Sequence, residues 1–277
     1  SVPRNLVVAL PDTIRFHEGC FATVGAIALQ GVRRVDPTIG ETVVVIGVGL
    51  IGLLTAQILC ANGCRVICVD LAAARLKLAA SLGIEHTLRA GAGDVVQSVL
   101  ALTGGDGADG VIVTAATKSS EPLNQAASIC RESGRVVIVG AVGMDLDREQ
   151  YYRKEIDLRI SRSYGPGRYD PEYEQKGMVY PLGYVRWTET RNLTAFLELV
   201  AAGKVAVKAL ISAEYDIQQA KQAYAKATAG AEETVAVLFR YARNGMSDGP
   251  ERVWRQPQQL PPKGGRVGMA LVGAGRF

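Results

Sequence analysis

The sequence lacks three features that would point to particular partners or surroundings. Its 31 Lys and Arg residues are spread along 277 residues, with a formal net charge of +4, and form no basic block. No nucleic-acid partner is therefore expected. Apolar runs such as Val43–Leu54 are too short and too rich in glycine to span a membrane. Because no signal peptide is recognisable either, we expect a cytoplasmic protein without a membrane segment.

The cysteines are few and odd in number, which argues against a disulfide framework. Of the five, Cys60, Cys64 and Cys68 run from a predicted helix end into a predicted strand. Buried thiols are the favoured interpretation, and a metal site is the alternative. Since a strand turns successive side chains to opposite faces and no histidine is near, we predict no metal ligands here.

Segments rich in Val and Ile alternate with helical patterns through the first two thirds of the chain, which is typical of parallel βαβ units. Continuously apolar strands, as expected for a sheet buried on both faces, are predicted at Thr42–Ile46, Arg65–Val69, Gly110–Thr114 and Arg135–Val139. Helices are predicted at Leu50–Ala61, Ala72–Leu82, Asp94–Leu102 and Pro122–Cys130. The predicted fold class is α/β, a doubly wound parallel sheet of Rossmann type with a partial second lobe.

The segments that flank this core have weaker patterns. A short strand is predicted at Leu6–Leu10 and a long helix at His17–Arg33. After a loop at Ser163–Trp187, the pattern predicts helices around Leu193–Ala202 and Ile217–Thr228 and a strand at Thr234–Phe239. The stretch that follows, rich in Pro, Gln and Gly, has the composition of a linker.

A glycine-rich motif follows the first strong strand. Gly47, Gly49 and Gly52 lie between that strand and a helix, in the spacing of a dinucleotide-binding fingerprint. The first glycine permits a tight turn, the second lets the backbone approach a pyrophosphate, and the third allows close packing of helix and strand. The helix start would present free N–H groups and a favourable dipole to the phosphates.

A carboxylate occupies the ribose position of the same fingerprint. Asp70 ends the second strand about 20 residues beyond the glycines, where it can accept hydrogen bonds from ribose hydroxyls and repel a 2′-phosphate. The predicted cofactor is therefore NAD rather than NADP. Arg75 could weaken this preference by neutralising Asp70 or by binding a phosphate. The alternative is that the glycines form only a tight turn and Asp70 only caps the strand, with no ligand bound. The common register of all three glycines and Asp70 with the fingerprint disfavours this alternative.

These motifs resemble the medium-chain dehydrogenase/reductase superfamily of zinc-type alcohol and sorbitol dehydrogenases. The matching stretches are Gly40–Gly52, Val69–Asp70, Gly134–Gly140 and Leu197–Val205, and the likeness covers about residues 2 to 241. It implies hydride transfer between a nicotinamide and a hydroxyl or carbonyl carbon. With the fingerprint, it gives this predicted cofactor-binding set: Gly47, Gly49, Leu50, Ile51, Gly52, Asp70, Arg75, Thr114, Ala115, Gly140, Ala141, Val142, Ser163, Tyr164 and Gly165.

A narrower resemblance concerns Ser163–Asp170 and Tyr184–Thr188, which look like a branch of bacterial two-part oxidoreductases. In that branch a medium-chain module is fused to a glucose-fructose oxidoreductase-like module. Residues Val267–Phe277 resemble the start of this second module. The resemblance implies a sugar or nucleotide-sugar substrate. Aromatic and Arg side chains suit such ligands, and the substrate-side candidates are Tyr164, Arg168, Tyr169, Arg186 and Trp187. Packing of this loop on another lobe is the alternative.

The resemblance also gives a domain organisation and marks the chain as part of a longer polypeptide. Residues 1–22 would be a remnant of a GroES-like catalytic lobe, 23–163 the Rossmann domain and 164–241 a return segment. Residues 242–265 would be a linker and 266–277 the truncated start of a second Rossmann module. The family's catalytic residues would then lie outside this chain, which alone is expected to be inactive.

Zinc is not predicted. The alignment places Thr23 at the last zinc-ligand position of the resembled family, and threonine is a poor zinc ligand. His17, Glu18 and Cys20 lie close in sequence but are expected to be part surface and part core. His86 is expected to be structural, in a loop before the third strand.

We therefore expect an NAD-dependent oxidoreductase with a small-molecule substrate, and a homodimer as its assembly. Two alternatives stay open. One is a non-catalytic NAD(H)-binding module, which turnover by the full-length protein would distinguish. The other is a zinc-independent NADPH enzyme of the quinone reductase type, which a preference for NADPH would reveal.

Overall fold

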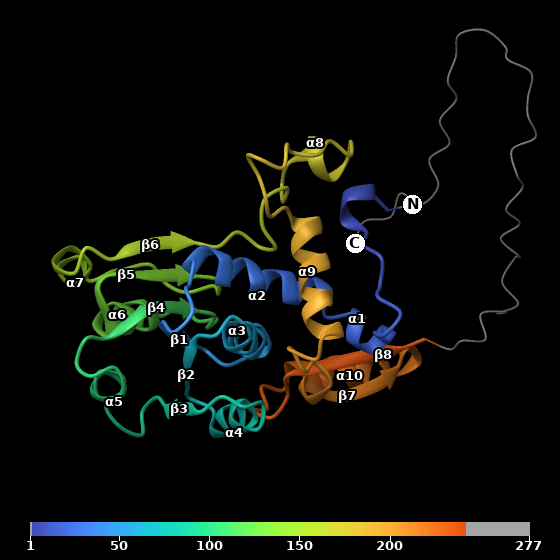
Figure 1. The fold of residues 1–277 in the computed structure, drawn as a ribbon. Helices are drawn as coiled ribbons and strands as arrows, with labels where there is room; N and C mark the ends of the chain where they lie inside the picture. Colours follow the sequence, from blue (N-terminus) through green and yellow to red (C-terminus); the bar gives the residue numbers. More distant parts are fainter. Residues whose placement is uncertain (1, 242–277) are drawn as a thin grey trace, which may run out of the picture. The chain divides into compact units, whose positions relative to one another are not determined.

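Six parallel strands form the central sheet, in the order β3-β2-β1-β4-β5-β6 (Figure 1). This is the strand order of a doubly wound Rossmann sheet, and it confirms the predicted fold class. The computed structural model describes residues 2–241, so the predicted linker at 242–265 and second module at 266–277 lie outside the described residues. The strand bounds are β1 Thr42–Ile46, β2 Arg65–Asp70, β3 His86–Arg89, β4 Ala108–Val113, β5 Cys130–Ile138 and β6 Asp157–Ile160.

The sheet is buried on both faces, as its apolar strands predict. All five residues of β1 are buried. Val43 and Val45 belong to one hydrophobic cluster, together with residues of α2 (Ala22–Val35) and α3 (Leu50–Ala61). Val44 and Ile46 belong to a second cluster on the other face. Four further helices connect the strands: α4 Ala73–Ser81, α5 Val95–Leu102, α6 Glu121–Ile129 and α7 Arg148–Arg153.

Small residues let α2 approach its neighbours closely. A Cβ at Gly25 would overlap the ring of Phe196 on α9 (Glu189–Ala201), and a Cβ at Gly31 would lie 2.7 Å from a methyl group of Val139. Phe196 is fully buried, so the ring has no room to move away. This packing places α9 directly beside α2 (Figure 1).

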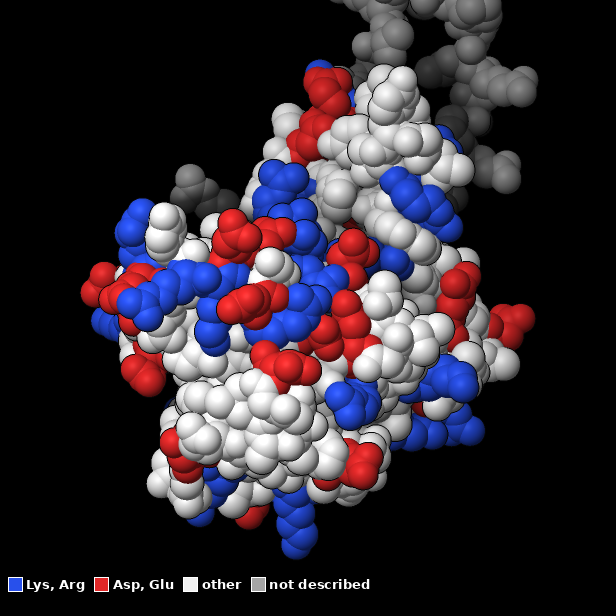
Figure 2. All heavy atoms as spheres, turned by 60° about the vertical axis from the view of Figure 1, so that its left-hand side comes forward, with Lys and Arg blue, Asp and Glu red and all other residues white. Residues whose placement is uncertain are grey.

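Ion pairs join the strands at their amino ends. Arg135 on β5 contacts Glu41 at 2.6 Å, and Arg131 contacts Asp109 on β4 at 2.8 Å. The Asp109 carboxylate also accepts a 2.8 Å hydrogen bond from the backbone N–H of Thr42. Figure 2 shows basic and acidic side chains interspersed on the face that it presents.

A smaller unit follows α9. Strands β7 (Ile211–Asp216) and β8 (Ala236–Arg240) pair in parallel and pack on α10 (Ala220–Thr228). The single-turn helix α8 (Pro171–Glu174) lies before α9. Two 3-10 turns, η2 (Lys208–Leu210) and η3 (Ile217–Gln219), lie before and after β7. Within residues 2–241, no helix has the length and apolar character that crossing a membrane requires.

Three local predictions were wrong. The predicted strand at Leu6–Leu10 has no partner strand in the described chain, and a 3-10 turn, η1 (Arg4–Leu6), precedes extended backbone. The predicted helix at His17–Arg33 is divided into α1 (Phe16–Gly19) and α2, with a turn at Cys20 and the buried Phe21 between them. His86 begins β3, pairing with Ile67, rather than lying in a loop.

Candidate functional site

A cavity of 540 Å³ lies at the carboxyl ends of β1, β2 and β4. Its volume is within the range of about 300–1,000 Å³ that is typical of small-molecule sites. Six predicted cofactor-binding residues line it, namely Gly47, Gly49, Asp70, Arg75, Thr114 and Ala115, whereas the predicted Leu50, Ile51 and Gly52 at the start of α3 do not. In an open α/β sheet, this edge is where ligands bind.

The glycines shape the floor of this cavity. Gly47 has a φ of 93° and its N–H donates to Val69 O at 2.8 Å, so the chain turns sharply at the end of β1. A Cβ at Gly52 would overlap the carbonyl oxygen of Gly47, whereas a Cβ at Gly49 would meet nothing within 4 Å. Gly47 and Gly52 are therefore needed for packing, and Gly49 keeps the cavity open.

The start of α3 is left free for a ligand. Gly49 caps this helix without any side-chain hydrogen bond, and no acidic residue lies in its first turn. Asp94 caps α5 and Thr188 caps α9 with side-chain oxygens, whereas α2, α4, α6 and α10 also begin without a side-chain cap, so what distinguishes α3 is that its cap residue is a glycine that lines the cavity. The first N–H groups of a helix have no partner within the helix. Those of Leu50, Ile51 and Gly52 therefore remain available to an anion at this end of the cavity.

Asp70 is held in place by the backbone. Its Oδ2 accepts a 2.6 Å hydrogen bond from Val48 N–H, and its Oδ1 accepts a 2.7 Å bond from Ala72 N–H. A carboxylate offers about four acceptor positions, so two remain for the hydroxyls of a ligand. Asp70 thus links the glycine turn to the end of β2 while it lines the cavity.

Arg75 lines the same cavity but does not neutralise Asp70. Its Nε donates to the carbonyl oxygen of Glu232 at 3.3 Å, and it forms no ion pair with a described residue. The carboxylate of Asp70 therefore keeps its charge uncompensated by Arg75 in this arrangement.

The predicted nicotinamide-side residues follow β5 and β6 on the same edge of the sheet, outside the cavity lining. Gly140 N–H donates to Val113 O at 2.9 Å, and a Cβ there would overlap the carbonyl oxygen of Ala115. Ala141 O accepts from Thr117 N–H at 2.8 Å. Gly140, Ala141 and Val142 therefore lie next to the cavity. Ser163, Tyr164 and Gly165 instead pack toward α9, where the carbonyl oxygen of Tyr164 accepts a 2.9 Å hydrogen bond from Asn192 Nδ2.

The five substrate-side candidates divide into two separate groups, neither of which lines this cavity. The Arg168 guanidinium lies 4.2 Å from the ring centre of Tyr169 and 5.3 Å from that of Tyr164. Arg168 also pairs with Glu174 at 2.8 Å. Arg186 and Trp187 instead contact each other, with Arg33 of α2 on the same indole ring.

Sequence reasoning missed several lining residues. Thr117, Ser119, Glu121 and Gln125 come from the segment after β4 and from α6, where the Ser-x-Glu start of a helix was a usable signal: Ser119 Oγ accepts from Glu121 N–H at 3.1 Å. Gly230 and Glu232 reach the cavity from the loop before β8. No sequence pattern connects that loop with Asp70.

Metal-ligating side chains do not gather in the described part of the chain. No group of three His, Cys, Asp or Glu residues there could hold an ion. Thr23 is exposed on α2, Cys20 donates to His17 O at 3.3 Å, and Glu18 accepts from Arg15 N–H at 3.0 Å. The described residues do not fit a zinc ion, so no step is derived through one.

Comparison with known proteins shows that this chain is similar to dehydrogenases. The family model described as zinc-binding dehydrogenase matches residues 51–176. An erythritol/L-threitol dehydrogenase of Mycolicibacterium smegmatis is 32% identical over 211 residues, covering 73% of this chain and 57% of that protein. These matches support the medium-chain dehydrogenase superfamily. The chain spans less than two thirds of the length of the curated relatives it matches.

Solved structures support the fold. An alcohol dehydrogenase from E. coli CFT073 complexed with NADH is 19% identical with a TM-score of 0.67, covering 83% of this chain and 61% of that one. A protein from Sinorhizobium meliloti 1021 bound to NADP is 25% identical with a TM-score of 0.65, again covering 83% and 61%. These two similarities support the Rossmann fold of this chain.

Replacing Gly49 with valine tests the cavity. The added side chain should fill the space next to the start of α3 and abolish NADH binding, while the fold survives because no atom lies within 4 Å of the new Cβ. Calorimetric titration with NADH and circular dichroism would measure the two effects. Gly52→Val is the matched control, because its Cβ overlaps Gly47 O and should unfold the turn. Normal NADH affinity in a folded Gly49→Val variant would place the cofactor elsewhere.

One titratable group that the sequence did not single out lies behind the 163–169 loop. Glu189, the first residue of α9, is 0% exposed, and neither of its carboxylate oxygens has a hydrogen-bond partner in the described chain. Burial, reinforced by the charge of Glu174, raises its pKa to about 7, against the opposing effect of Arg168 and Arg162. The folded protein therefore retains this proton at acidic pH.

This raised pKa predicts how stability depends on pH. In the unfolded chain the carboxyl loses its proton near 4.5, and in the folded chain near 7. The contribution of Glu189 is thus fully present below pH 4.5 and is lost as pH rises to about 7, by on the order of 3 kcal/mol. Urea denaturation between pH 4 and 8 should show a smaller decline for Glu189→Gln than for the wild type. Glu85→Gln, at an exposed position, is the control; parallel curves for wild type and Glu189→Gln would contradict the assignment.

Proposed function

We propose that this chain is the cofactor-binding part of an NAD-dependent oxidoreductase that transfers a hydride between nicotinamide and a hydroxyl or carbonyl carbon. The observation that carries the proposal is the uncapped start of α3 facing a cavity that Asp70 also lines. The family match and the NADH and NADP complexes of similar proteins support a nicotinamide cofactor.

The residues of this chain fit such a cofactor. The N–H groups of Leu50, Ile51 and Gly52 would hold the pyrophosphate, with the helix dipole adding to the attraction. The two free acceptor positions of Asp70 would bind the adenosine ribose hydroxyls. When bound, the nicotinamide supplies the hydride chemistry. The predicted residues Gly140, Ala141, Val142, Ser163, Tyr164 and Gly165 would lie toward the nicotinamide end of this edge.

The proposed substrate is a polyhydroxylated small molecule, a sugar or nucleotide sugar. The name of the erythritol/L-threitol dehydrogenase relative supports this class. Tyr164, Arg168 and Tyr169 are the better placed candidates to bind it, since they follow β6 at the carboxyl edge of the sheet. Arg186 and Trp187 are less favoured, because they pack against the last turn of α2. The homodimer stays a prediction.

NAD should bind more tightly than NADP because the Asp70 carboxylate would repel a 2′-phosphate. Asp70→Asn removes the charge but keeps one acceptor and the size of the side chain, so it should weaken NADH binding modestly and reduce the preference over NADPH at least tenfold. Paired calorimetric titrations of both cofactors would measure the ratio, with Arg75→Gln as the second variant. Equal or tighter NADPH binding by the wild type would favour the quinone reductase type of enzyme instead.

This chain by itself should bind NADH without turnover. Thr23 occupies the only zinc-ligand position of the resembled family that aligns here, and a closed zinc site needs about four ligands. A positioned acid or base contributes about a hundredfold or more to such reactions. Zinc analysis and a dehydrogenase assay with polyols, sugars and nucleotide sugars would test this, with the erythritol/L-threitol dehydrogenase relative as positive control. Stoichiometric zinc or steady turnover would show that the prediction of an inactive, zinc-free chain is wrong.

A further inference from the structure

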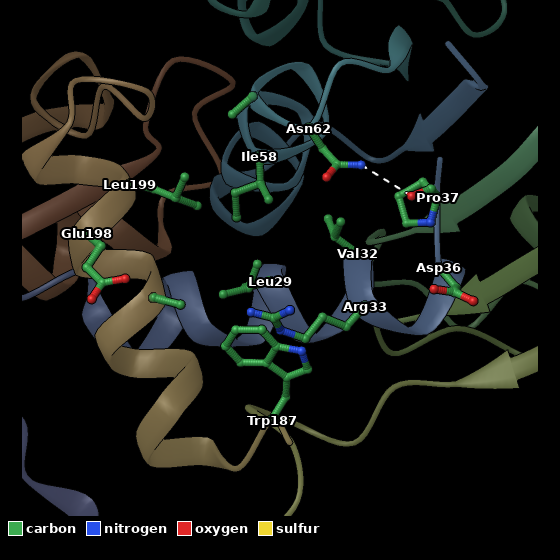
Figure 3. Close-up of a pocket in the computed structure, with 12 residues that line it drawn as sticks. Leu29, Val32, Arg33, Asp36, Pro37, Ile58, Asn62, Trp187, Glu198 and Leu199 are labelled. Atoms are coloured by element: carbon green, nitrogen blue, oxygen red, sulfur yellow. Dashed lines mark hydrogen bonds between the residues drawn. The ribbon is translucent and has the colours of Figure 1, made fainter. Parts of the chain in front are cut away.

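A second cavity, of 510 Å³, lies between α2, α3 and α9 (Figure 3). It is bordered by Ile58 and Asn62, near the end of α3, whereas Gly49 marks the start of that helix at the first cavity. A helix of 12 residues is about 18 Å long. The two cavities are therefore separate, and of the residues named for the proposed dehydrogenase function only Trp187, a less favoured substrate candidate, borders the second one.

Arg33 holds a fixed position in this cavity. Its guanidinium carbon lies 3.3 Å from the ring centre of Trp187, and its Nε donates to Asn192 Oδ1 at 2.8 Å. Figure 3 shows the guanidinium lying flat across the indole ring, within the space that Leu29 also borders. Because one face and the Nε are engaged, the side chain is oriented before any ligand arrives.

The terminal N–H groups of this guanidinium have no acceptor. Among residues 2–241, neither Nη atom of Arg33 donates a hydrogen bond, and no carboxylate lies within 4.0 Å of it. The Nη groups of an arginine form a planar fork that matches a carboxylate. Neither Nη atom is among the buried polar atoms that lack a partner, so both are open to the cavity and can meet a ligand there.

Arg186 makes the surroundings more positive. Its guanidinium carbon lies 3.8 Å from the centre of the same indole ring. Two guanidiniums this close to one ring centre must occupy opposite faces, since on one face they would overlap. Burial and the charge of Arg186 lower the pKa of Arg33 to about 10, which leaves Arg33 charged at neutral pH. An anion would relieve this repulsion between like charges.

The walls of the cavity restrict the kind of anion. Leu29, next to the guanidinium in Figure 3, and Ile58 and Leu199 elsewhere in the lining provide the aliphatic surface of the cavity. Asp36 and Glu198 also border the cavity and are exposed, so a second negative charge on the ligand would meet repulsion there. A single carboxylate with an aliphatic body satisfies both conditions better than a phosphate does.

We propose that the cavity between α2, α3 and α9 binds a small aliphatic monocarboxylate, whose carboxylate pairs with the Nη groups of Arg33 and whose chain packs on Leu29, Ile58 and Leu199. The indole of Trp187 and the amide of Asn192 position the guanidinium. This site is independent of the nicotinamide cavity at the other end of α3.

Hexanoate is the probe, and saturation-transfer NMR titration of the full chain gives its dissociation constant. The wild type should bind hexanoate at least tenfold more tightly than either hexanol, which lacks the charge, or inorganic phosphate, which lacks the aliphatic body. Arg33→Gln should weaken hexanoate binding at least tenfold, and Glu198→Gln should strengthen it by removing a repelling charge. Arg34→Gln, at the exposed neighbouring position, is the matched control and should bind as the wild type does.

NADH titration of each variant separates this proposal from the cofactor assignment, since all four proteins should bind NADH equally. Circular dichroism establishes that Arg33→Gln is folded, and Arg33→Lys provides a second variant that keeps the charge and loses the fork. The proposal is overturned if the wild type fails to bind hexanoate, if it binds phosphate as tightly, or if folded Arg33→Gln and Arg33→Lys both bind hexanoate as the wild type does.

Discussion

The turn between β1 and α3 is the constraint on which the site depends. Gly52 must lack a side chain because the carbonyl oxygen of Gly47 occupies the space where a Cβ would lie. This contact sets the direction in which α3 leaves the sheet. Gly47 in turn adopts a φ of 93° and lies against the backbone of Ala115 after β4. Two glycine-dependent contacts thus bring β1, α3 and β4 together around one cavity, and Asp70 joins β2 to them through Val48.

The two ends of α3 illustrate how one scaffold supports different chemistry. At its start, where no side chain caps the helix, Gly49 lines the cavity at the carboxyl edge of the sheet. At its end, Ile58 and Asn62 border a cavity whose charge comes from a side chain, Arg33, rather than from the backbone. A backbone site of the first kind suits a pyrophosphate in any sequence that keeps the glycines. The second site depends on a particular set of side chains and is a more specific feature of this chain.

Much of the fold could be predicted from sequence because the central strands are buried on both faces. The predicted Thr42–Ile46 is identical to β1, since a continuously apolar run has only one environment in which it is stable. The edge strands β3 and β6 were missed for the converse reason: their residues are half-buried or exposed and carry no apolar run. At Leu6–Leu10 a strand-like pattern was present, but pairing requires a neighbouring strand, which local sequence does not reveal.

The residues of the candidate site likewise divide into those that sequence spacing reveals and those that it does not. Gly47, Gly49 and Asp70, which line the cavity, and Gly52 of the adjoining turn could be singled out because their spacing reflects a local turn and one βαβ unit. Gly230 and Glu232 reach the cavity from more than 150 residues away, and Glu189 is distinguished only by its burial behind the 163–169 loop. Such relationships arise from tertiary packing and leave no pattern along the chain.

A crystal structure of this chain with NADH would show whether the turn between β1 and α3 holds the cofactor. We expect the pyrophosphate at the N–H groups of Leu50, Ile51 and Gly52, with the adenosine ribose hydroxyls within hydrogen-bond distance of Asp70. A dinucleotide bound with its phosphates away from the start of α3, or with Asp70 contacting only the backbone of Val48 and Ala72, would contradict it.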